Sequence, residues 1–456
     1  MAGIQDATGV QFASGQDFFD HILTDWYEPI IVDTRNNSAV LWMLLPNAGK
    51  RNIAGKFVTY PARTTRNNQG FNAVHPGGKF PDPGSQGADT HTFRYRHMLA
   101  RVLIDEDTMD AANTNGGSYA DVLQFEIEGL MDDIVIQQNR MVHNDGSGRL
   151  AEVVSTTGTD VTLRINQDIE GAATCTTKPT LFIEEGMRLA FMTNLGASIA
   201  VKYVTAIVSD SVIQVADTPT GANDTTGIAA ADWVCLISGE YTSATDFIQS
   251  GFRAEPMGIA GIYSDAGVLD GNGLASGQTG SNDLTTTSTA SAGFQGIAAN
   301  ASNAFNQGII LDNGGVARPI TESLMQQALS DAEETNNANI DLMLSSFSTY
   351  NSYVALLTPD KRYNDTLDLK GGHQVLSFNG IGWVKDRHAY GNRVYFMAMD
   401  QFKIYENRPL SWVDFHGRRW DILPDDDKFQ ARMKTQYTVA CDVRNKTGAL
   451  LVDLNA

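Results

Sequence analysis

Cysteine is scarce in this chain, which contains only three among 456 residues. They lie far apart and are odd in number (Cys175, Cys235 and Cys441), so the sequence predicts neither a disulfide framework nor a thiolate metal site. The eight histidines form no ligand-spaced pair on a predicted helix. We therefore expect a protein of a reducing compartment that holds no metal and no other cofactor.

Long hydrophobic runs and sorting signals are also missing. The longest strongly apolar stretch, residues 39–45, is far too short to span a bilayer. The N-terminal sequence MAGIQDATGVQFASG has neither a basic nor an apolar segment, so no secretion signal is expected. The chain is expected to be soluble, intracellular at synthesis and without a membrane partner.

Signatures of the common enzyme classes are absent. There is no phosphate-binding G-x-x-x-x-G-K-[ST] loop, no H-E-x-x-H, no G-x-S-x-G and no EF-hand loop. Gly271, Gly273 and Gly277 approach a dinucleotide-binding fingerprint but have the wrong spacing. Acidic runs at 105–107 and 425–427 are typical of solvated turns. The sequence therefore predicts a protein that is not an enzyme.

Positive charge is in deficit, since 33 Lys and Arg face 53 Asp and Glu and the net charge is −20. A general nucleic-acid binder needs a surplus of cations to neutralise phosphates, so that class is disfavoured. A protein that encloses nucleic acid without holding it remains compatible with this charge. One segment differs from the rest, because residues 51–101 carry eight cations against Asp82 and Asp89, a local charge of +6.

The two ends of this basic segment are typical of strands, at 56–60 and 92–104, whereas its Gly- and Pro-rich middle has no apolar period. A long hairpin with such a tip cannot bury itself and is marginal in water. It is either a solvated surface loop or an arm that docks on a neighbouring subunit. In the second case its apolar anchors would be Phe57, Tyr60, Phe71, Phe80 and Phe93.

Residues 118–144 predict the clearest helix, which begins near Ser118 and would be roughly 40 Å long. One face is apolar and the other is acidic. The separation of opposite charges suggests that the hairpin of one subunit lies over the helix of the next. This intersubunit contact would join Arg63, Arg66, Lys79, Arg94 and Arg96 to Glu126, Glu128, Asp132 and Asp133.

The other segments differ in character. Residues 1–50 look like an arm whose apolar anchors need a partner distant in the chain or on another chain; these anchors are Phe18, Phe19, Ile22 and Trp42. Short β-prone runs between 150 and 250 predict an inserted β-barrel or sandwich, at 161–165, 181–183, 187–191, 199–208, 212–215 and 233–237. Residues 256–318 look linker-like, and from Thr321 to about 405 helices and strands alternate. Residues 429–444 predict one period-two strand, roughly 50 Å long.

This order of parts resembles the major capsid protein of tailed double-stranded DNA bacteriophages, a fold shared with encapsulins. The resemblance is carried by the hairpin 56–101, the helix 118–144 and the stretch 341–406. In that stretch DLMLSSFSTYNSYVALLTPDKRY is followed by GGHQVLSFNGIGWVKD and NRVYFMAMDQFKIYEN, and the closing QYTVACDVRNKTGALLVDL also looks like the end of such coat proteins. The resemblance covers nearly the whole chain but is architectural, since no single motif in it is diagnostic.

The resemblance implies an α+β fold of the tailed-phage major capsid type. Its parts would be an N-terminal arm (1–50), an extended hairpin loop (51–104), a peripheral domain with a long spine helix (105–149), an inserted β domain (150–250), an α/β axial domain (251–410) and C-terminal strands that return to the peripheral domain (411–456). Such a protein is a structural component of the virion. It is assembled in the host cytoplasm as pentamers and hexamers of an icosahedral head around packaged double-stranded DNA.

The implied partners are further copies of the chain, a separate scaffolding protein, a portal and a decoration or cement protein. The arm is too short for a fused scaffolding domain, and the presence of Met1 suggests no maturation cleavage. Some members of the family crosslink a hairpin lysine to an asparagine of a neighbour. Lys56 or Lys79 with Asn445 would be the candidates here, on position alone.

Two other interpretations remain open. An encapsulin-like compartment would share the fold but enclose protein cargo instead of DNA. A β-rich carbohydrate-active enzyme or adhesin would explain the Gly, Asn and Thr content, but it would not explain the segregation of opposite charges in the hairpin and the helix.

Overall fold

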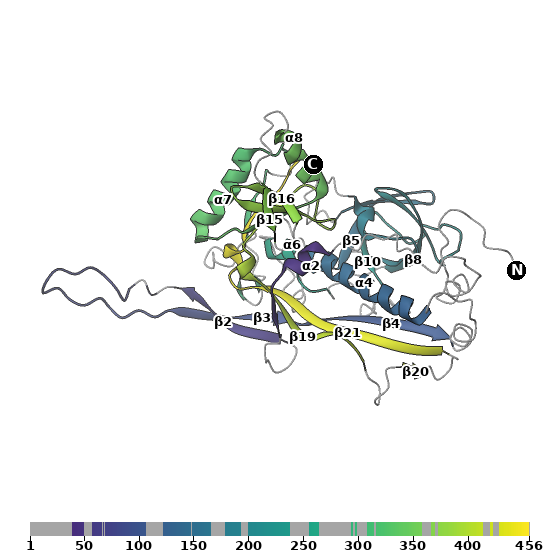
Figure 1. The fold of residues 1–456 in the computed structure, drawn as a ribbon, viewed down its shortest axis with the longest axis horizontal. Helices are drawn as coiled ribbons and strands as arrows, with labels where there is room; N and C mark the ends of the chain where they lie inside the picture. Colours follow the sequence, from purple (N-terminus) through teal and green to yellow (C-terminus); the bar gives the residue numbers. More distant parts are fainter. Residues whose placement is uncertain are drawn as a thin grey trace.

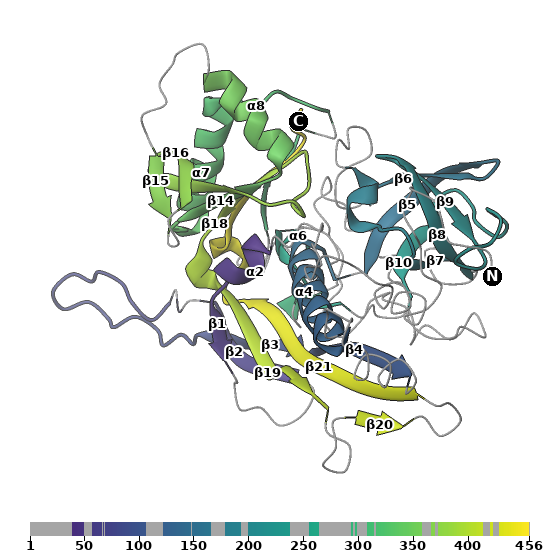
Figure 2. The same cartoon turned by 45° about the vertical axis from the view of Figure 1, so that its right-hand side comes forward.

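The computed structural model contains a projecting hairpin, two larger sheets, a closed barrel and a long helix (Figures 1 and 2). The helix lies between the barrel and one of the sheets (Figure 2). No helix in the described ranges is long and apolar enough to cross a membrane. The structure describes residues 39–49, 57–65, 67, 69–105, 122–146, 148–165, 178–192, 199–237, 255–263, 293–294, 297–298, 308–313, 316–357, 366–369, 373–413, 420–422 and 428–455.

A five-stranded sheet, called the base sheet here, is built around one long strand. Its strands are β1 (Asn47–Gly49), β4 (Arg96–Asp105), β19 (Phe402–Trp412), β20 (Trp420–Ile422) and β21 (Lys428–Cys441). β21 pairs antiparallel with β4 along one edge and with β19 and β20 along the other. Its odd-numbered side chains from Ala431 to Cys441 are buried, as the predicted period of two requires, but Gln430, Thr438 and Ala440 are buried as well. The strand ends at Cys441, so the predicted end at residue 444 was wrong.

The helix that packs on the base sheet is α4 (Val122–His143), with 22 residues. It corresponds to the helix predicted over 118–144, of which residues 118–121 lie outside the described part. The described helix spans about 33 Å. It ends at the predicted Asn144-Asp145-Gly146 turn, where Gly146 adopts a φ of +84° that glycine tolerates best.

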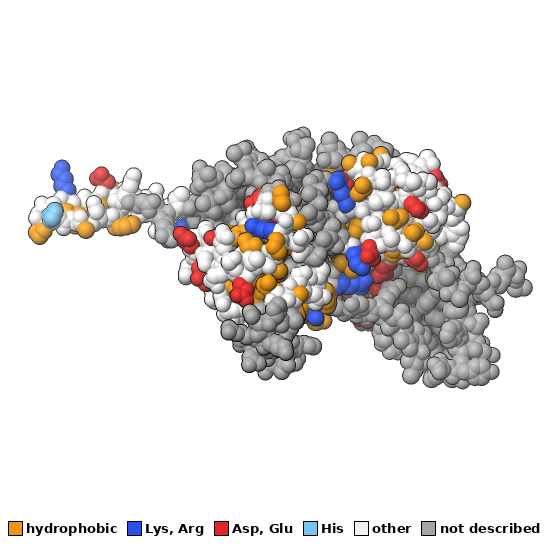
Figure 3. All heavy atoms as spheres, turned by 90° about the horizontal axis from the view of Figure 1, so that it is seen from above, with side chains coloured by type: hydrophobic (Ala, Val, Ile, Leu, Met, Phe, Trp, Pro, Cys, Tyr) orange, Lys and Arg blue, Asp and Glu red, His pale blue; other side chains and the backbone are white. Residues whose placement is uncertain are grey.

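The hairpin consists of β2 (Phe57–Thr65) and β3 (Gly87–Arg94), and it projects from the body in Figures 1 and 3. The single strand predicted over 92–104 was wrong, because the chain breaks at the buried Tyr95 and continues as β4 in the base sheet. Residues 57–94 therefore carry Arg63, Arg66, Lys79 and Arg94 against Asp82 and Asp89, a net charge of +2. A short ladder, β11 (Gly293–Phe294) with β12 (Ile297–Ala298), lies near β3.

The inserted β segment closes into a barrel with the strand order β10-β5-β6-β9-β8-β7. Its interior is filled by buried apolar side chains, among them Val161, Phe191 and Val204. The strand predicted at 181–183 was wrong, because Pro179 begins a 3₁₀ turn, η1 (Pro179–Phe182). The barrel strands are β5 (Arg149–Thr157), β6 (Asp160–Arg164), β7 (Arg188–Met192), β8 (Ile199–Ser209), β9 (Val212–Ala216) and β10 (Trp233–Leu236).

The α/β part is a seven-stranded sheet, called the axial sheet here, with the order β13-β22-β18-β14-β17-β16-β15. The predicted cap is confirmed, since Thr321 Oγ1 accepts from Leu324 N at 3.3 Å at the start of α7. The strand predicted at 402–405 lies in β19 and thus in the base sheet. The elements are β13 (Ile309–Leu311), α7 (Glu322–Asn336), β14 (Leu342–Ser345), α8 (Phe347–Leu357), β15 (Thr366–Leu369), β16 (His373–Phe378), β17 (Ile381–Lys385), β18 (Val394–Met397), η5 (Met399–Gln401), η6 (Arg444–Lys446) and β22 (Gly448–Leu451).

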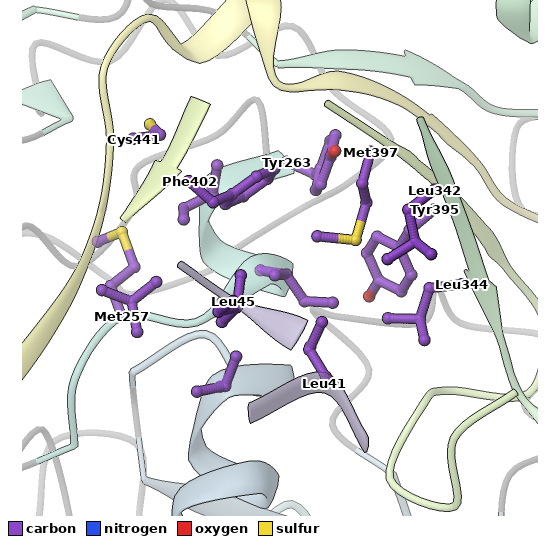
Figure 4. Close-up of a cluster of buried hydrophobic side chains, with 14 of the residues drawn as sticks. Leu41, Leu45, Met257, Tyr263, Leu342, Leu344, Tyr395, Met397, Phe402 and Cys441 are labelled. Carbon is purple, nitrogen blue, oxygen red and sulfur yellow. The ribbon is translucent and has the colours of Figure 1, made fainter. Parts of the chain in front are cut away.

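One apolar core joins the base sheet, the axial sheet and the short helices α2 (Val40–Leu44) and α6 (Ile259–Tyr263) (Figure 4). Leu41 and Tyr263 are fully buried in it. The linker-like interpretation was wrong for residues 256–263, which pack tightly. Gly258 lies so close to the end of α4 that a Cβ there would be 2.2 Å from the Val142 carbonyl oxygen.

Candidate assembly surfaces

The hairpin tip presents aromatic side chains to solvent. Phe71 is 72% exposed and Phe80 is 96% exposed. Asn67 braces the tip, because its Nδ2 donates to the Gly84 carbonyl at 2.9 Å and its Oδ1 accepts from Gly70 N at 2.8 Å. Hydrogen bonds of Asn67 therefore hold the loop of the tip together, while the side chains of Phe71 and Phe80 stay exposed in the single chain.

The structure separates the predicted hairpin cations. Arg63 and Lys79 are exposed on the hairpin, whereas Arg96 is half-buried in β4, opposite Tyr437. Arg66 lies outside the described residues. Arg94 lies on β3, and the apolar positions Phe57, Tyr60 and Phe93 lie on the hairpin strands, but the side chains of these four lie outside the described part.

The predicted acidic face of α4 is described only in part. Asp132 is exposed and Asp133 is half-buried, and both already interact within the chain. The side chains of Glu126 and Glu128 lie outside the described part. Because the hairpin projects away from α4 (Figures 1 and 2), one chain does not bring the two predicted surfaces together. A contact between them stays a prediction about neighbouring subunits.

Of the predicted arm anchors, Trp42 is placed and Phe18, Phe19 and Ile22 lie outside the described residues. Trp42 meets the ring of Tyr437 edge-on at a centroid distance of 5.1 Å. Its backbone N donates to Asn139 Oδ1 at 2.9 Å. Trp42 is thus packed against distant segments of the same chain.

A buried polar junction, centred on Asp386, joins α2, α4 and the loop after β17. Asp386 Oδ2 accepts from Leu41 N at 3.2 Å and from Asn139 Nδ2 at 3.1 Å. His143 Nε2 lies 3.1 Å from the same oxygen, and His388 N donates to Oδ1 at 2.9 Å. One carboxylate thereby fixes the relative positions of three elements.

The electrostatics of this junction depend on burial. Burial opposes ionisation of Asp386, but His143 and His388 outweigh it and hold the pKa of the carboxyl well below its usual range. Burial lowers the pKa of the His388 imidazole, which also stacks on Phe182 of the barrel at 6.0 Å between centroids. The junction thus links the barrel as well as the two sheets.

A buried ion pair lies beside this junction, at the next residue of α4 after Asn139. The Arg140 guanidinium donates to both carboxylate oxygens of Glu255, just before α6, and Asn144 Nδ2 donates to Glu255 Oε2 at 3.2 Å. Both charged side chains are almost completely buried. Breaking such a pair leaves an uncompensated charge in the interior.

These junction residues were missed at the sequence level. His143 and His388 were considered only as metal ligands, and no group of three or more ligating side chains suited to a metal occurs among the described residues. The one available signal was the polar character of the last helical turns, which contain Asn139, Arg140 and His143. Their partners are more than 100 residues away, which no local pattern can indicate.

We expect the folded chain to lose stability as the pH falls below about 6.5. In the unfolded chain His388 binds a proton that the folded site resists, so acid favours the unfolded state. A His388→Gln variant should show a smaller change in melting temperature between pH 7.5 and pH 5.5 than the parent chain. His75→Gln, at the exposed tip, is the control; equal pH slopes for the parent and His388→Gln would contradict the assignment.

The fold was compared with solved structures. A chain of the cyanophage A-1(L) capsid asymmetric unit superposes with a TM-score of 0.51 at 12% identity, covering 94% of this chain and 96% of that one. The capsid of Myoviridae phage XM1 gives 0.43 at 9% identity, with 99% of each chain covered. The holo-SrpI encapsulin complex from Synechococcus elongatus gives 0.44 at 8% identity, covering 98% and 96%.

Sequence comparison adds no relative, since no protein-family profile and no curated protein matches the chain. The similarity to the cyanophage capsid chain extends over nearly the full length of both proteins. The fold class that the sequence predicted, α+β, agrees with this similarity. The chain therefore has the fold of the major capsid proteins of tailed bacteriophages.

Proposed function

We propose that this protein is the structural subunit of a phage head, in which copies assemble as pentamers and hexamers into an icosahedral shell around packaged double-stranded DNA. The observation that carries the proposal is the near full-length similarity in fold to a cyanophage capsid chain. The projecting hairpin, whose aromatic tip its own chain leaves uncovered, supports it. The protein acts as a structural element of the virion and not as an enzyme.

Assembly proceeds by docking of each hairpin on a neighbouring subunit. Burial of a phenylalanine side chain contributes about 1.5–3 kcal/mol, whereas an exposed ion pair contributes about 0–1 kcal/mol. Phe71 and Phe80 therefore supply most of the affinity. Arg63 and Lys79 set the register against acidic side chains such as Asp132 of the next subunit.

The remaining parts take the roles that this fold implies. The hairpin 57–94 forms the extended loop, the base sheet with α4 the peripheral domain, and the axial sheet with α7 and α8 the axial domain, while Phe18, Phe19 and Ile22 anchor the arm. The boundaries predicted from the sequence shift accordingly, because β4 and β19 pair with β21 in the base sheet and β22 pairs with β18 in the axial sheet. A separate scaffolding protein, a portal and a decoration protein act with the shell, which is assembled in the host cytoplasm.

The test is nuclease treatment of particles purified from cells that produce the complete phage. We expect closed shells in negative-stain micrographs, with double-stranded DNA that survives nuclease until the particles are opened. Shells that contain protein cargo and no protected DNA would identify an encapsulin-like compartment instead. Single chains without shells would contradict both interpretations.

We expect no covalent crosslinks between subunits. Asn445 is only 5% exposed, in η6 of its own chain, so a lysine from a neighbour cannot reach its carboxamide. Lys79 is exposed at the tip, and Lys56 lies outside the described residues. Particles boiled in detergent should run as single chains of 49.5 kDa, identical for the parent and for Lys79→Arg. A ladder of multimers that Lys79→Arg abolishes would contradict this expectation.

A further inference from the structure

The base sheet has a cationic outer face. On β21 the odd-numbered side chains face the core, so Arg432 and Lys434 lie on the opposite face. The register places Arg101 of β4 directly opposite Arg432. On the other edge Ser411 of β19 lies opposite Lys434, and the Arg408 guanidinium donates to Ser411 Oγ at 2.8 Å. Directly opposed residues of antiparallel strands share a face, so these cations form one surface.

This surface contrasts with the chain as a whole. By register the outer face carries six cations, Arg101, Lys403, Arg408, Lys428, Arg432 and Lys434. The carboxylates of the same face are Asp105, Asp421 and Asp442, and Asp442 is already bonded to Lys403. Counted over the described strand residues, the face therefore has a net charge of +3, in a chain of net charge −20.

Resting on the proposed function, we propose that the outer face of the base sheet contacts the phosphate backbone of the enclosed DNA through Arg101, Arg408, Arg432 and Lys434. This face of the sheet would then line the interior of the shell. The overall negative charge keeps the contact weak, so the DNA is positioned without being held.

Two features favour phosphates over an acidic protein segment. Three of the four cations are arginines, whose planar fork matches phosphate oxygens in two parallel hydrogen bonds. The cations also lie on the part of the face between the buried Gln430 and Thr438, where alternate residues of a strand stand about 6.8 Å apart. An acidic protein would in addition use Leu99, which is 69% exposed between Arg101 and His97 on this face. A phosphate backbone would make no apolar contact with the Leu99 side chain.

The inference is tested with unassembled full-length subunits and a fluorescein-labelled duplex of about 20 base pairs, by fluorescence anisotropy. Four phosphate contacts predict an apparent Kd that rises on the order of 10²-fold between 50 and 200 mM salt. Arg101→Gln with Lys434→Gln should weaken binding and reduce the slope of log K against log salt by about two. Lys178→Gln with Lys385→Gln, which removes exposed cations of the barrel and the axial sheet, is the matched control and should leave binding unchanged.

The Leu99→Gln variant distinguishes the two kinds of partner, and we expect it to bind the duplex like the parent chain. Absence of binding at 50 mM salt, or an equal loss in the control variant, would overturn the inference. So would displacement of the duplex by poly-glutamate of equal charge together with weaker binding by Leu99→Gln, since that pattern indicates an acidic protein partner.

Micrographs of the same variants separate this inference from the proposed function. Arg101→Gln with Lys434→Gln should still form shells, and if it alone fails to do so the face is an assembly contact and the inference falls. If the parent chain itself forms no shells, the proposed function fails whatever the duplex shows.

Discussion

Replacing Phe71 and Phe80 together with serine should abolish shell formation while the isolated subunit stays folded. The two side chains are largely exposed in the single chain, so their removal takes almost no packing from it. In the shell their loss would remove about 3–6 kcal/mol from every hairpin contact. This corresponds to a 10²- to 10⁴-fold weaker contact, repeated at each subunit.

The measurement is the yield of particles by sedimentation and electron microscopy, with the melting temperature of the subunit as the check on folding. Val316→Ser, which replaces an apolar side chain that is similarly exposed on the body, is the control and should leave the yield unchanged. Normal shells from the Phe71→Ser, Phe80→Ser variant would show that the tip is a solvated loop.

The second large effect is expected at the junction between the two sheets and the barrel. Asp386→Ala should destabilise the fold by about 3–5 kcal/mol, because Leu41 N, the Asn139 amide and His143 would lose their common buried partner. The melting temperature should fall by roughly 5–10 °C. Asp386→Asn keeps an acceptor oxygen for Leu41 N and should have an intermediate effect.

Asp210→Ala is the matched control for this effect. It removes an exposed aspartate whose ion pair with Lys178 is open to solvent, and such pairs contribute little. A melting temperature that falls equally for Asp386→Ala and Asp210→Ala would show that the junction does not bind the parts of the molecule together.

The sequence predicted elements whose patterns are local. The Thr321 cap of α7 and the alternation of buried side chains along β21 follow from residues within a few positions of one another. The interruption at Tyr95 does not, because β3 and β4 read as one continuous β-prone run and only pairing with β21 assigns β4 to the base sheet. For the same reason the charge of +6 over 51–101 was attributed to the hairpin, although Arg96 and Arg101 belong to the sheet.

The hairpin tip could be predicted from local sequence, whereas the junction at Asp386 could not. An aromatic residue in a Gly- and Pro-rich tip indicates an external partner, because its neighbours in sequence cannot bury it, and Phe71 and Phe80 were selected on that ground. Asp386 gave no such signal. A buried aspartate and a solvated one are identical in sequence, and the contacts that distinguish them come from residues 139, 143 and 41.

The most direct test is a cryo-electron-microscopy reconstruction of the concentrated, purified protein. We expect closed shells in which residues 67–86 of each subunit lie on an adjacent copy, with Phe71 and Phe80 covered. Monomeric particles in which the hairpin folds back on its own chain would contradict the central claim that neighbouring copies complete this fold.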